Sequence, residues 1–128
     1  MPKVFTSEKQ KIGEIGENVA EKFLMKHGFS ILERNYTKKW GEIDIVAEKK
    51  NKIHFIEVKS VTYETNMDHL RPEENMHPWK LQRLARAIQT YILSRKLDER
   101  EWQIDLLVAF LNLKDRTAKV KVLKNIIL

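Results

Sequence analysis

Two carboxylates and one ammonium group lie close together in the first half of the chain. Asp44 lies in the run GEIDIVAE (residues 41–48), and Glu57 and Lys59 lie in the run IHFIEVK (residues 53–59). One or two carboxylates hold Mg²⁺, which takes oxygen ligands and keeps several waters. A nearby ammonium group can orient or deprotonate an attacking water, or stabilise charge developing on a phosphate. This combination is typical of magnesium-dependent nucleases.

A β-hairpin is the element that would bring these side chains together. Both runs are rich in β-branched and apolar residues, and the sequence KKNK between them (residues 49–52) has the composition of a turn. A turn centred between Lys50 and Asn51 fixes the register of the two strands. The resulting cross-strand pairs are Glu48 with Ile53, Val46 with Phe55, Asp44 with Glu57, and Glu42 with Lys59.

Side chains alternate between the two faces of a strand, so this register sorts the hairpin into two sets. One face carries Glu42, Asp44, Glu57 and Lys59, and the other carries Ile43, Ile45, Ile56 and Val58. Opposed residues place their Cβ atoms ~5 Å apart, where like charges repel, so Asp44 and Glu57 require a cation. The alternative is a solvated face with weak ion pairs, and a one-residue slip in register would separate the carboxylates.

Length and composition predict one globular domain, residues 1–128. The chain has 42% hydrophobic and 33% charged residues. This composition is sufficient for a packed core and is typical of neither disordered nor fibrous proteins. The 24 Lys+Arg residues exceed the 18 Asp+Glu residues and give a net charge of +6. A basic protein favours polyanionic partners such as nucleic acid, although a modest charge also serves solubility.

Several classes of site and location are excluded by composition. The chain has no cysteine, so it has no disulfide, thiolate metal site or cysteine nucleophile. Its start, MPKVFTSEKQK, lacks the apolar segment of a signal peptide, and the apolar run 106–111 is too short to span a bilayer. We therefore expect a soluble, cytoplasmic protein without a membrane partner.

The first helix is expected from Ser7 to His27. Ser7 and Gln10 resemble a capping box, and apolar residues then recur at helical spacing. Small residues on one side of this helix, Gly13, Gly16 and Ala20, permit close approach to a sheet. Glu17 lies at the edge of this side and could reach a metal site or a bound strand. Alternatively, Glu14, Glu17 and Glu21 form an ordinary solvated stripe.

The second helix is expected from Pro78 to about Lys96. Its polar side is basic and could line phosphates, or could simply be solvated: Lys80, Gln82, Arg83, Arg86 and Arg95. Three more strands are expected at residues 29–36, 102–112 and 118–127, and Asp105 interrupts the apolar run of the second of these. The element order is α, three β, α, two β. Residues 60–78 are expected to form a long loop, whose His69 and His77 receive no role.

Five ordered blocks carry a resemblance to a known family. They are GEIGENVAEKFL from Gly13, ILERNY from Ile31, GEIDIVA from Gly41, FIEVKS from Phe55 and PWKLQRLARAIQTYI from Pro78. Over nearly its whole length the chain resembles the YraN family, small bacterial proteins placed in the restriction-endonuclease-like, PD-(D/E)XK superfamily. The resemblance implies an α/β fold in which helices flank a mixed central sheet.

The resemblance also implies roles for individual residues. Asp44, Glu57 and Lys59 match the metal-binding and catalytic positions of the superfamily, and Ile43 stands where the signature has proline. Glu17 matches a first-helix glutamate that Holliday-junction resolvases place near the metal, and Lys80 matches a basic position at the start of the second helix.

Three functions follow as hypotheses. The first is a Mg²⁺- or Mn²⁺-dependent nuclease that acts on DNA, with branched or structured DNA suggested by analogy with resolvases. The second is a nucleic-acid-binding module that keeps the nuclease fold without turnover. The third is a protein-interaction domain whose basic surface is incidental. Resolvase-like proteins that cut two strands also suggest a homodimer.

Overall fold

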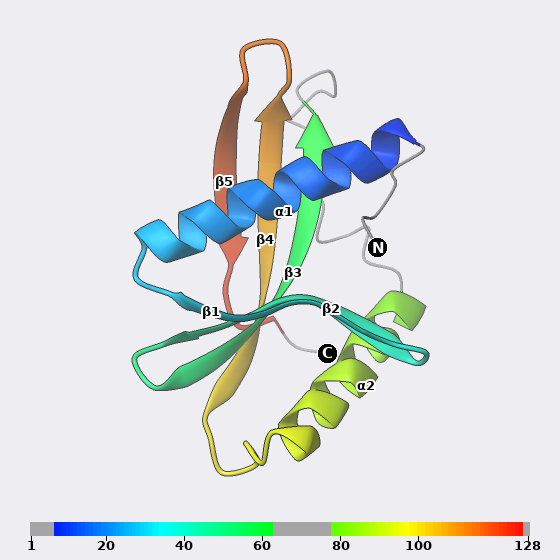
Figure 1. Cartoon of the computed structure of the whole chain (residues 1–128), viewed down its shortest axis with the longest axis vertical. Coiled ribbons are helices and arrows are strands. Elements are labelled where there is room, and N and C mark those ends of the chain that lie inside the picture. The colour runs from blue at the N-terminus through cyan, green and yellow to red at the C-terminus, as the bar shows by residue number, and fades with distance from the viewer. Residues whose placement is uncertain (1–6, 63–77, 127–128) are drawn as a thin grey trace.

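The computed structural model describes residues 7–62 and 78–126, which form two helices and five strands (Figure 1). The elements are α1 (Glu8–Lys26), β1 (Ser30–Lys38), β2 (Gly41–Lys49), β3 (Lys52–Thr62), α2 (Pro78–Ser94), β4 (Trp102–Asn112) and β5 (Thr117–Leu123). Their order is the one predicted from the sequence. Neither helix combines the length and apolar character that crossing a membrane requires.

The five strands form one open mixed sheet in the order β1-β2-β3-β4-β5. Neighbouring strands are antiparallel except β3 and β4, which are parallel and are connected through α2. In Figure 1, α1 crosses over β3, β4 and β5, whereas α2 lies beside the hairpin of β1 and β2. The observed fold is therefore of the α/β class, with a mixed sheet and one helix packed on each of its faces.

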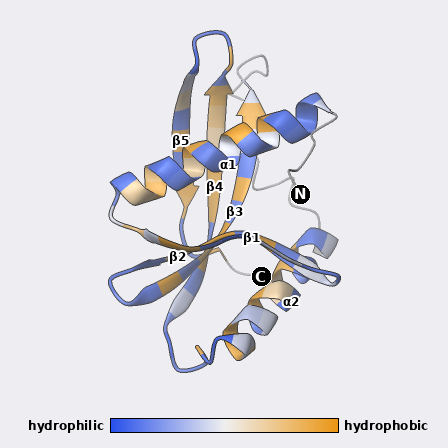
Figure 2. Ribbon diagram, in the orientation of Figure 1, coloured by the Kyte–Doolittle hydropathy of each residue, from blue (hydrophilic) through white to orange (hydrophobic). Residues whose placement is uncertain are grey.

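Two hydrophobic clusters occupy the two faces of this sheet. Phe55 belongs to the cluster under α2, together with Leu84 and Tyr91, whereas its neighbour Ile56 belongs to the cluster under α1, together with Leu24. All five side chains are almost completely buried. Figure 2 shows the corresponding apolar strands at the centre of the sheet and polar turns at its ends. Because both faces are covered, β3 and β4 are apolar along most of their length.

The predicted register of the hairpin formed by β2 and β3 is confirmed near its turn. Glu48 pairs with Ile53 and Val46 pairs with Phe55, but the ladder between β2 and β3 ends at the pair of Ile45 and Ile56. Before Ile45, β2 continues alongside β1 alone. The cross-strand pairing predicted for Asp44 with Glu57 and for Glu42 with Lys59 is therefore absent from the ladder of these described strands.

The prediction that Ile43 and Ile45 share one face is wrong. Ile43 packs in the cluster under α2, and Ile45 packs in the cluster under α1. A strand that loses one neighbour twists more strongly, because two-stranded ribbons twist more than wider sheets. The change of face falls at Asp44, where β2 separates from β3. This fork between two strands determines the position of the candidate site.

Close backbone contacts hold both helices against the sheet. A Cβ atom at Gly16 of α1 would lie 1.7 Å from Ser60 Oγ of β3, and a Cβ atom at Gly41 of β2 would lie 1.9 Å from the carbonyl oxygen of Arg83 in α2. Trp40 Nε1 also donates a hydrogen bond of 2.8 Å to Thr90 Oγ1 of α2. The small-residue side predicted for the first helix therefore approaches the sheet at Gly16, as expected.

Element ends differ from the predictions by a few residues. Ser7 is the N-cap of α1 and its Oγ accepts a hydrogen bond from the backbone N–H of Gln10 at 3.2 Å, as the capping box predicts. β3 extends to Thr62, so residues 60–62 are strand and not loop. β5 ends at Leu123, short of the predicted end at residue 127, and Asn125 has a φ of 57°. His69 and His77 lie outside the described residues.

Candidate metal centre

Asp44 lies at the fork between β2 and β3. Its Oδ2 atom accepts a hydrogen bond of 2.8 Å from the backbone N–H of Val58, so the side chain takes the place of a strand-to-strand hydrogen bond. Beside this fork is a cleft of about 630 Å³. Four elements contribute titratable residues to it: Lys9 and Glu17 from α1, Glu42 and Asp44 from β2, Glu57 and Lys59 from β3, and Lys80 from α2.

Asp44 and Glu57 lie against each other although they are not ladder partners. Glu57 is only 4% exposed. Burial raises the pKa of Asp44 to about 8, the negative charge of Glu57 and a hydrogen bond with its side chain add to this, and the hydrogen bond from Val58 acts in the opposite direction. Two buried carboxylates in contact either share a proton or bind a cation. The expected convergence of these two side chains is therefore present in the structure.

Lys80 supplies a positive charge to this pair. Its Nζ atom lies 2.7 Å from Glu57 Oε1. Burial alone would lower the pKa of Lys80, but the negative charges of Glu57 and Asp44 outweigh it and the pKa is raised. The sequence placed Lys80 among phosphate contacts, whereas the structure places it on a carboxylate of the candidate site.

Glu17 reaches the same cleft from α1. Burial and the neighbouring Asp44 raise its pKa. Its Oε1 atom is buried without a hydrogen-bond partner and lies 3.7 Å from Arg34 Nε, which is too long for a hydrogen bond. Arg34 also contacts Glu14 at 3.5 Å and Glu21 at 3.0 Å. The three glutamates are thus gathered around one arginine instead of forming a solvated stripe.

Lys59 and Glu42 line the cleft at its sides. Lys59 is partly buried, and its backbone lies opposite Val108 of β4 in the parallel ladder. Glu42 is exposed on β2. The predicted catalytic residues Asp44, Glu57 and Lys59 therefore border one cavity.

The remaining basic residues of α2 lie outside this cleft. Arg83 Nη1 donates a hydrogen bond of 3.3 Å to the carbonyl oxygen of Lys39, and Arg95 lies 3.7 Å from Glu33. Gln82 and Arg86 are exposed. Among the described residues, Lys80 lines the cleft, whereas the other members of the predicted nucleic-acid-binding set do not.

Two features of the site were not found from the sequence. The first is Arg34 of β1, which pairs with the three glutamates of α1. The sequence feature that could have revealed it is a charged residue within a strand-like run. Trp79 precedes Lys80 and is 56% exposed, beside a smaller cavity that Glu42, Glu57 and Arg83 also line. An exposed tryptophan at the start of a basic helix was the signal for this second feature.

The donor set favours a hard cation with a hydrated coordination shell. No group of three or more His, Cys, Asp or Glu side chains is assembled as a metal cage in residues 7–62 and 78–126. Paired carboxylates nevertheless fit Mg²⁺, because that ion binds one or two carboxylates and retains waters. Glu17 also lines the cleft, but its Oε1 atom is buried beside Arg34 Nε. Asp44 and Glu57 would hold the ion.

The fold and the site define a small α/β protein with a cleft, lined by carboxylates and lysines, at the fork of two strands. The chain belongs to the Uncharacterised protein family UPF0102, which it matches over residues 16–118. It is 38% identical to a UPF0102 protein of Moorella thermoacetica, over 93% of this chain and 97% of that protein. It is 35% identical to a UPF0102 protein of Flavobacterium psychrophilum, over 85% of this chain and 88% of that protein.

Proposed function

We propose that this protein is a Mg²⁺- or Mn²⁺-dependent nuclease of the restriction-endonuclease-like, PD-(D/E)XK superfamily. The observation that carries the proposal is the contact of the partly buried carboxylate of Asp44 with the buried carboxylate of Glu57 in a cleft that Lys59 also lines. Like charges in contact are costly to bury, and a divalent cation removes that cost. The match of Asp44, Glu57 and Lys59 to the metal-binding and catalytic positions of the superfamily supports the same function.

Four residues of the cleft would take part in phosphodiester hydrolysis. Asp44 and Glu57 would hold the divalent ion, and Glu17 would accept a hydrogen bond from a water at its edge. When bound, that ion stabilises negative charge on the phosphate and makes water a stronger nucleophile. Lys59 orients the attacking water and stabilises the charge that develops on the phosphate oxygens.

Lys80 has two positions in this proposal. Its ammonium group lies 2.7 Å from Glu57 Oε1 and neutralises this carboxylate. Its side chain is 42% exposed and comes from a different element than Glu57, so it is able to move toward solvent. A cation held by Asp44 and Glu57 would supply the same positive charge, and Lys80 would then contact a phosphate of the substrate.

DNA is the substrate class that the surface around the cleft favours. The exposed Gln82 and Arg86 lie on α2, and a net charge of +6 attracts the phosphate backbone. Trp79 offers an exposed ring on which a base that is not paired can stack. These features favour DNA with unpaired or branched segments.

A non-catalytic nucleic-acid-binding module is the second candidate. The observation that favours it is the ion pair of Lys80 with Glu57, because it neutralises one carboxylate without a metal. This candidate predicts DNA binding that weakens with salt and no cleavage with any divalent ion.

Cleavage assays distinguish the two candidates. Purified protein is incubated with branched, single-stranded and duplex DNA and with RNA, with EDTA, Mg²⁺ or Mn²⁺. The matched variants are Asp44→Asn and Asp98→Asn, since Asp98 is an exposed aspartate outside the cleft. We expect metal-dependent cleavage that Asp44→Asn removes and Asp98→Asn keeps. Absence of cleavage together with absence of metal binding would exclude the nuclease.

A further inference from the structure

A second cavity lies at the other end of α1. It has a volume of about 530 Å³ and lies between the last turn of α1, the turn from β2 to β3, the start of β4 and the end of β5. Among the described residues, none lines both this cavity and the Asp44 cleft. Glu17 and His27, which border one cavity each, are ten residues apart in sequence, or about 15 Å along the helix axis. The cavity is therefore a separate site.

The floor of this cavity is apolar and partly aromatic. Phe23, Phe29, Ile56 and Leu107 are among its lining residues. The ring of Phe29 meets the ring of His54 edge to face, with centroids 5.0 Å apart. Small-molecule sites of this size are lined mainly by apolar and aromatic side chains with a few polar groups. A flat, weakly polar ring system matches such a floor.

One of the polar groups that line the cavity is His54, whose orientation is fixed by a hydrogen bond. His54 Nδ1 lies 2.7 Å from Asp105 Oδ2, and Asp105 is 3% exposed. The other oxygen, Oδ1, accepts hydrogen bonds from Gln103 Nε2 at 2.7 Å and from the backbone N–H of Asn125 at 2.9 Å. A carboxylate accepts hydrogen bonds, so the hydrogen lies on Nδ1 of His54. In the neutral ring, Nε2 is then an acceptor for an amino group of a ligand.

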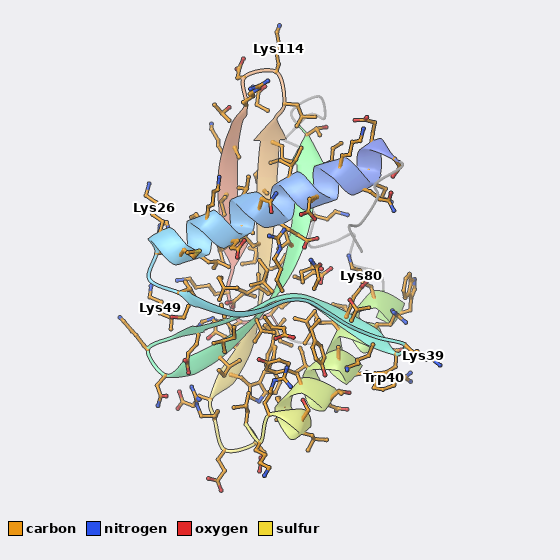
Figure 3. All side chains as sticks on the ribbon, viewed as in Figure 1. Lys26, Lys39, Trp40, Lys49, Lys80 and Lys114 are labelled. Carbon is orange, nitrogen blue, oxygen red and sulfur yellow. The ribbon has the colours of Figure 1, made fainter. Side chains whose placement is uncertain are left out.

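The rim of the cavity is basic. Four lysines line it, Lys49, Lys50, Lys52 and Lys124, against one exposed carboxylate, Glu101. The Nζ atom of Lys49 lies 5.0 Å from the centroid of the Phe29 ring, and Figure 3 shows Lys49 on the same side of the molecule as Lys26, which lies in the last turn of α1. A net positive rim beside an apolar floor selects a molecule that joins a flat ring to an anion.

We infer that this cavity binds a mononucleotide unit, either a free nucleotide or the terminal nucleotide of a strand. The base lies on the apolar floor, its exocyclic amino group donates a hydrogen bond to His54 Nε2, and the phosphate is held by the lysines of the rim. Binding here is independent of the metal centre, so it does not depend on nuclease activity.

Calorimetric and NMR titrations of the full chain in EDTA test this inference. The probes are AMP, adenosine, inorganic phosphate and a 5′-phosphorylated dinucleotide of adenine. We expect saturable binding of AMP to one site, with shifts of the His54 ring and the Gln103 side-chain amide. Adenosine and phosphate should each bind at least about tenfold more weakly, because each lacks half of the ligand. A dinucleotide that binds more tightly than AMP would identify a strand end as the ligand, and the reverse order a free nucleotide.

Charge-reversal variants locate the binding. Lys50→Glu changes the rim, and Lys114→Glu changes an exposed lysine of the turn between β4 and β5, at the far end of the molecule in Figure 3. We expect Lys50→Glu to weaken AMP binding by about fivefold or more and Lys114→Glu to leave it unchanged. Equal weakening by both variants, shifts confined to the Asp44 cleft, or no binding of any probe at millimolar concentration would overturn the inference.

Discussion

Asp44 and Asp105 are two aspartates in central strands of one sheet, and their surroundings are opposite. Both oxygens of Asp105 are satisfied by donors of the chain itself, namely His54, Gln103 and the backbone N–H of Asn125. Asp44 accepts one backbone hydrogen bond and otherwise contacts another carboxylate, Glu57. Burial of an acid therefore does not by itself mark a metal site. A site is marked by a buried acid that the chain leaves incompletely compensated.

The largest difference between the two aspartates is expected in catalysis. Asp44→Asn removes a proposed ligand of the divalent ion, and we expect the loss of several kcal/mol of charge stabilisation to lower the cleavage rate by roughly a thousandfold or more. Single-turnover cleavage of the best DNA substrate, with saturating Mn²⁺, measures this effect. Asp98→Asn is the control and should retain the wild-type rate. A rate for Asp44→Asn within about threefold of wild type would contradict the proposed role of Asp44.

The second difference is in stability, where the effects should have opposite signs. Asp105→Asn puts an amide group among three donors, and we expect a loss of about 2–3 kcal/mol in the free energy of unfolding. Asp44→Asn keeps an oxygen acceptor for Val58 and removes the repulsion with Glu57. In EDTA it should therefore be at least as stable as the wild type. Urea unfolding monitored by circular dichroism measures both values, and a large destabilisation by Asp44→Asn would be inconsistent with repulsion in the native pair.

The pH dependence of stability should follow Asp44. Its pKa is raised to about 8 in the folded protein, above the ordinary aspartate value of 3.8, so the folded state binds a proton that the unfolded chain releases. The free energy of unfolding contributed by this group therefore falls as pH rises from about 4 to about 8. Glu17, whose pKa is also raised, acts in the same direction.

Thermal unfolding in EDTA between pH 5 and pH 8.5 measures this dependence. We expect the unfolding temperature of the wild type to fall by several degrees over this range, and that of Asp44→Asn to fall less. Mn²⁺ should restore the wild type at pH 8 and leave Asp44→Asn unchanged, since the ion replaces the proton between the carboxylates. Parallel curves for both proteins would show that Asp44 does not govern the dependence.

The smallest effect is expected for Lys80. Lys80→Met removes the ammonium group that competes with a divalent ion for Glu57, so the affinity for Mn²⁺ should rise by about threefold. The same change should weaken DNA binding and lower its salt dependence by about one phosphate contact. Calorimetry and a salt series of DNA-binding measurements give the two values. A weaker affinity for Mn²⁺ would mean that Lys80 supports the ion-binding geometry instead of competing with the ion.

Local sequence patterns predicted the helices and strands, but they did not predict the contacts between residues far apart in the sequence. The turn at Lys50 and Asn51 set the register of the hairpin correctly near its closed end, because that register depends on neighbouring residues. The fork at Asp44 depends on β1 and α2, which hold the open half of β2 away from β3, and no local pattern contains that information.

The same distinction holds for the candidate sites. Strand alternation predicted that Asp44 and Glu57 converge, but the ladder pairing on which that prediction rested is absent and the two side chains meet where β2 separates from β3. The contact of Lys80 with Glu57 joins elements that the chain connects through residues 63–77. Asp105 was visible as a polar interruption in an apolar strand. Its partner His54 was not, because their contact depends on the parallel pairing of β3 with β4.

Binding of Mn²⁺ is the most direct test of the proposed metal centre at Asp44 and Glu57, because it requires no knowledge of the substrate. Calorimetric titration at pH 8 and low ionic strength compares the wild type with Asp44→Asn and with the control Asp98→Asn. We expect a specific Mn²⁺ site in the wild type and in Asp98→Asn. In Asp44→Asn the affinity for Mn²⁺ should be at least about tenfold weaker. Equal affinity in all three proteins, or no binding by the wild type, would contradict the proposed metal centre.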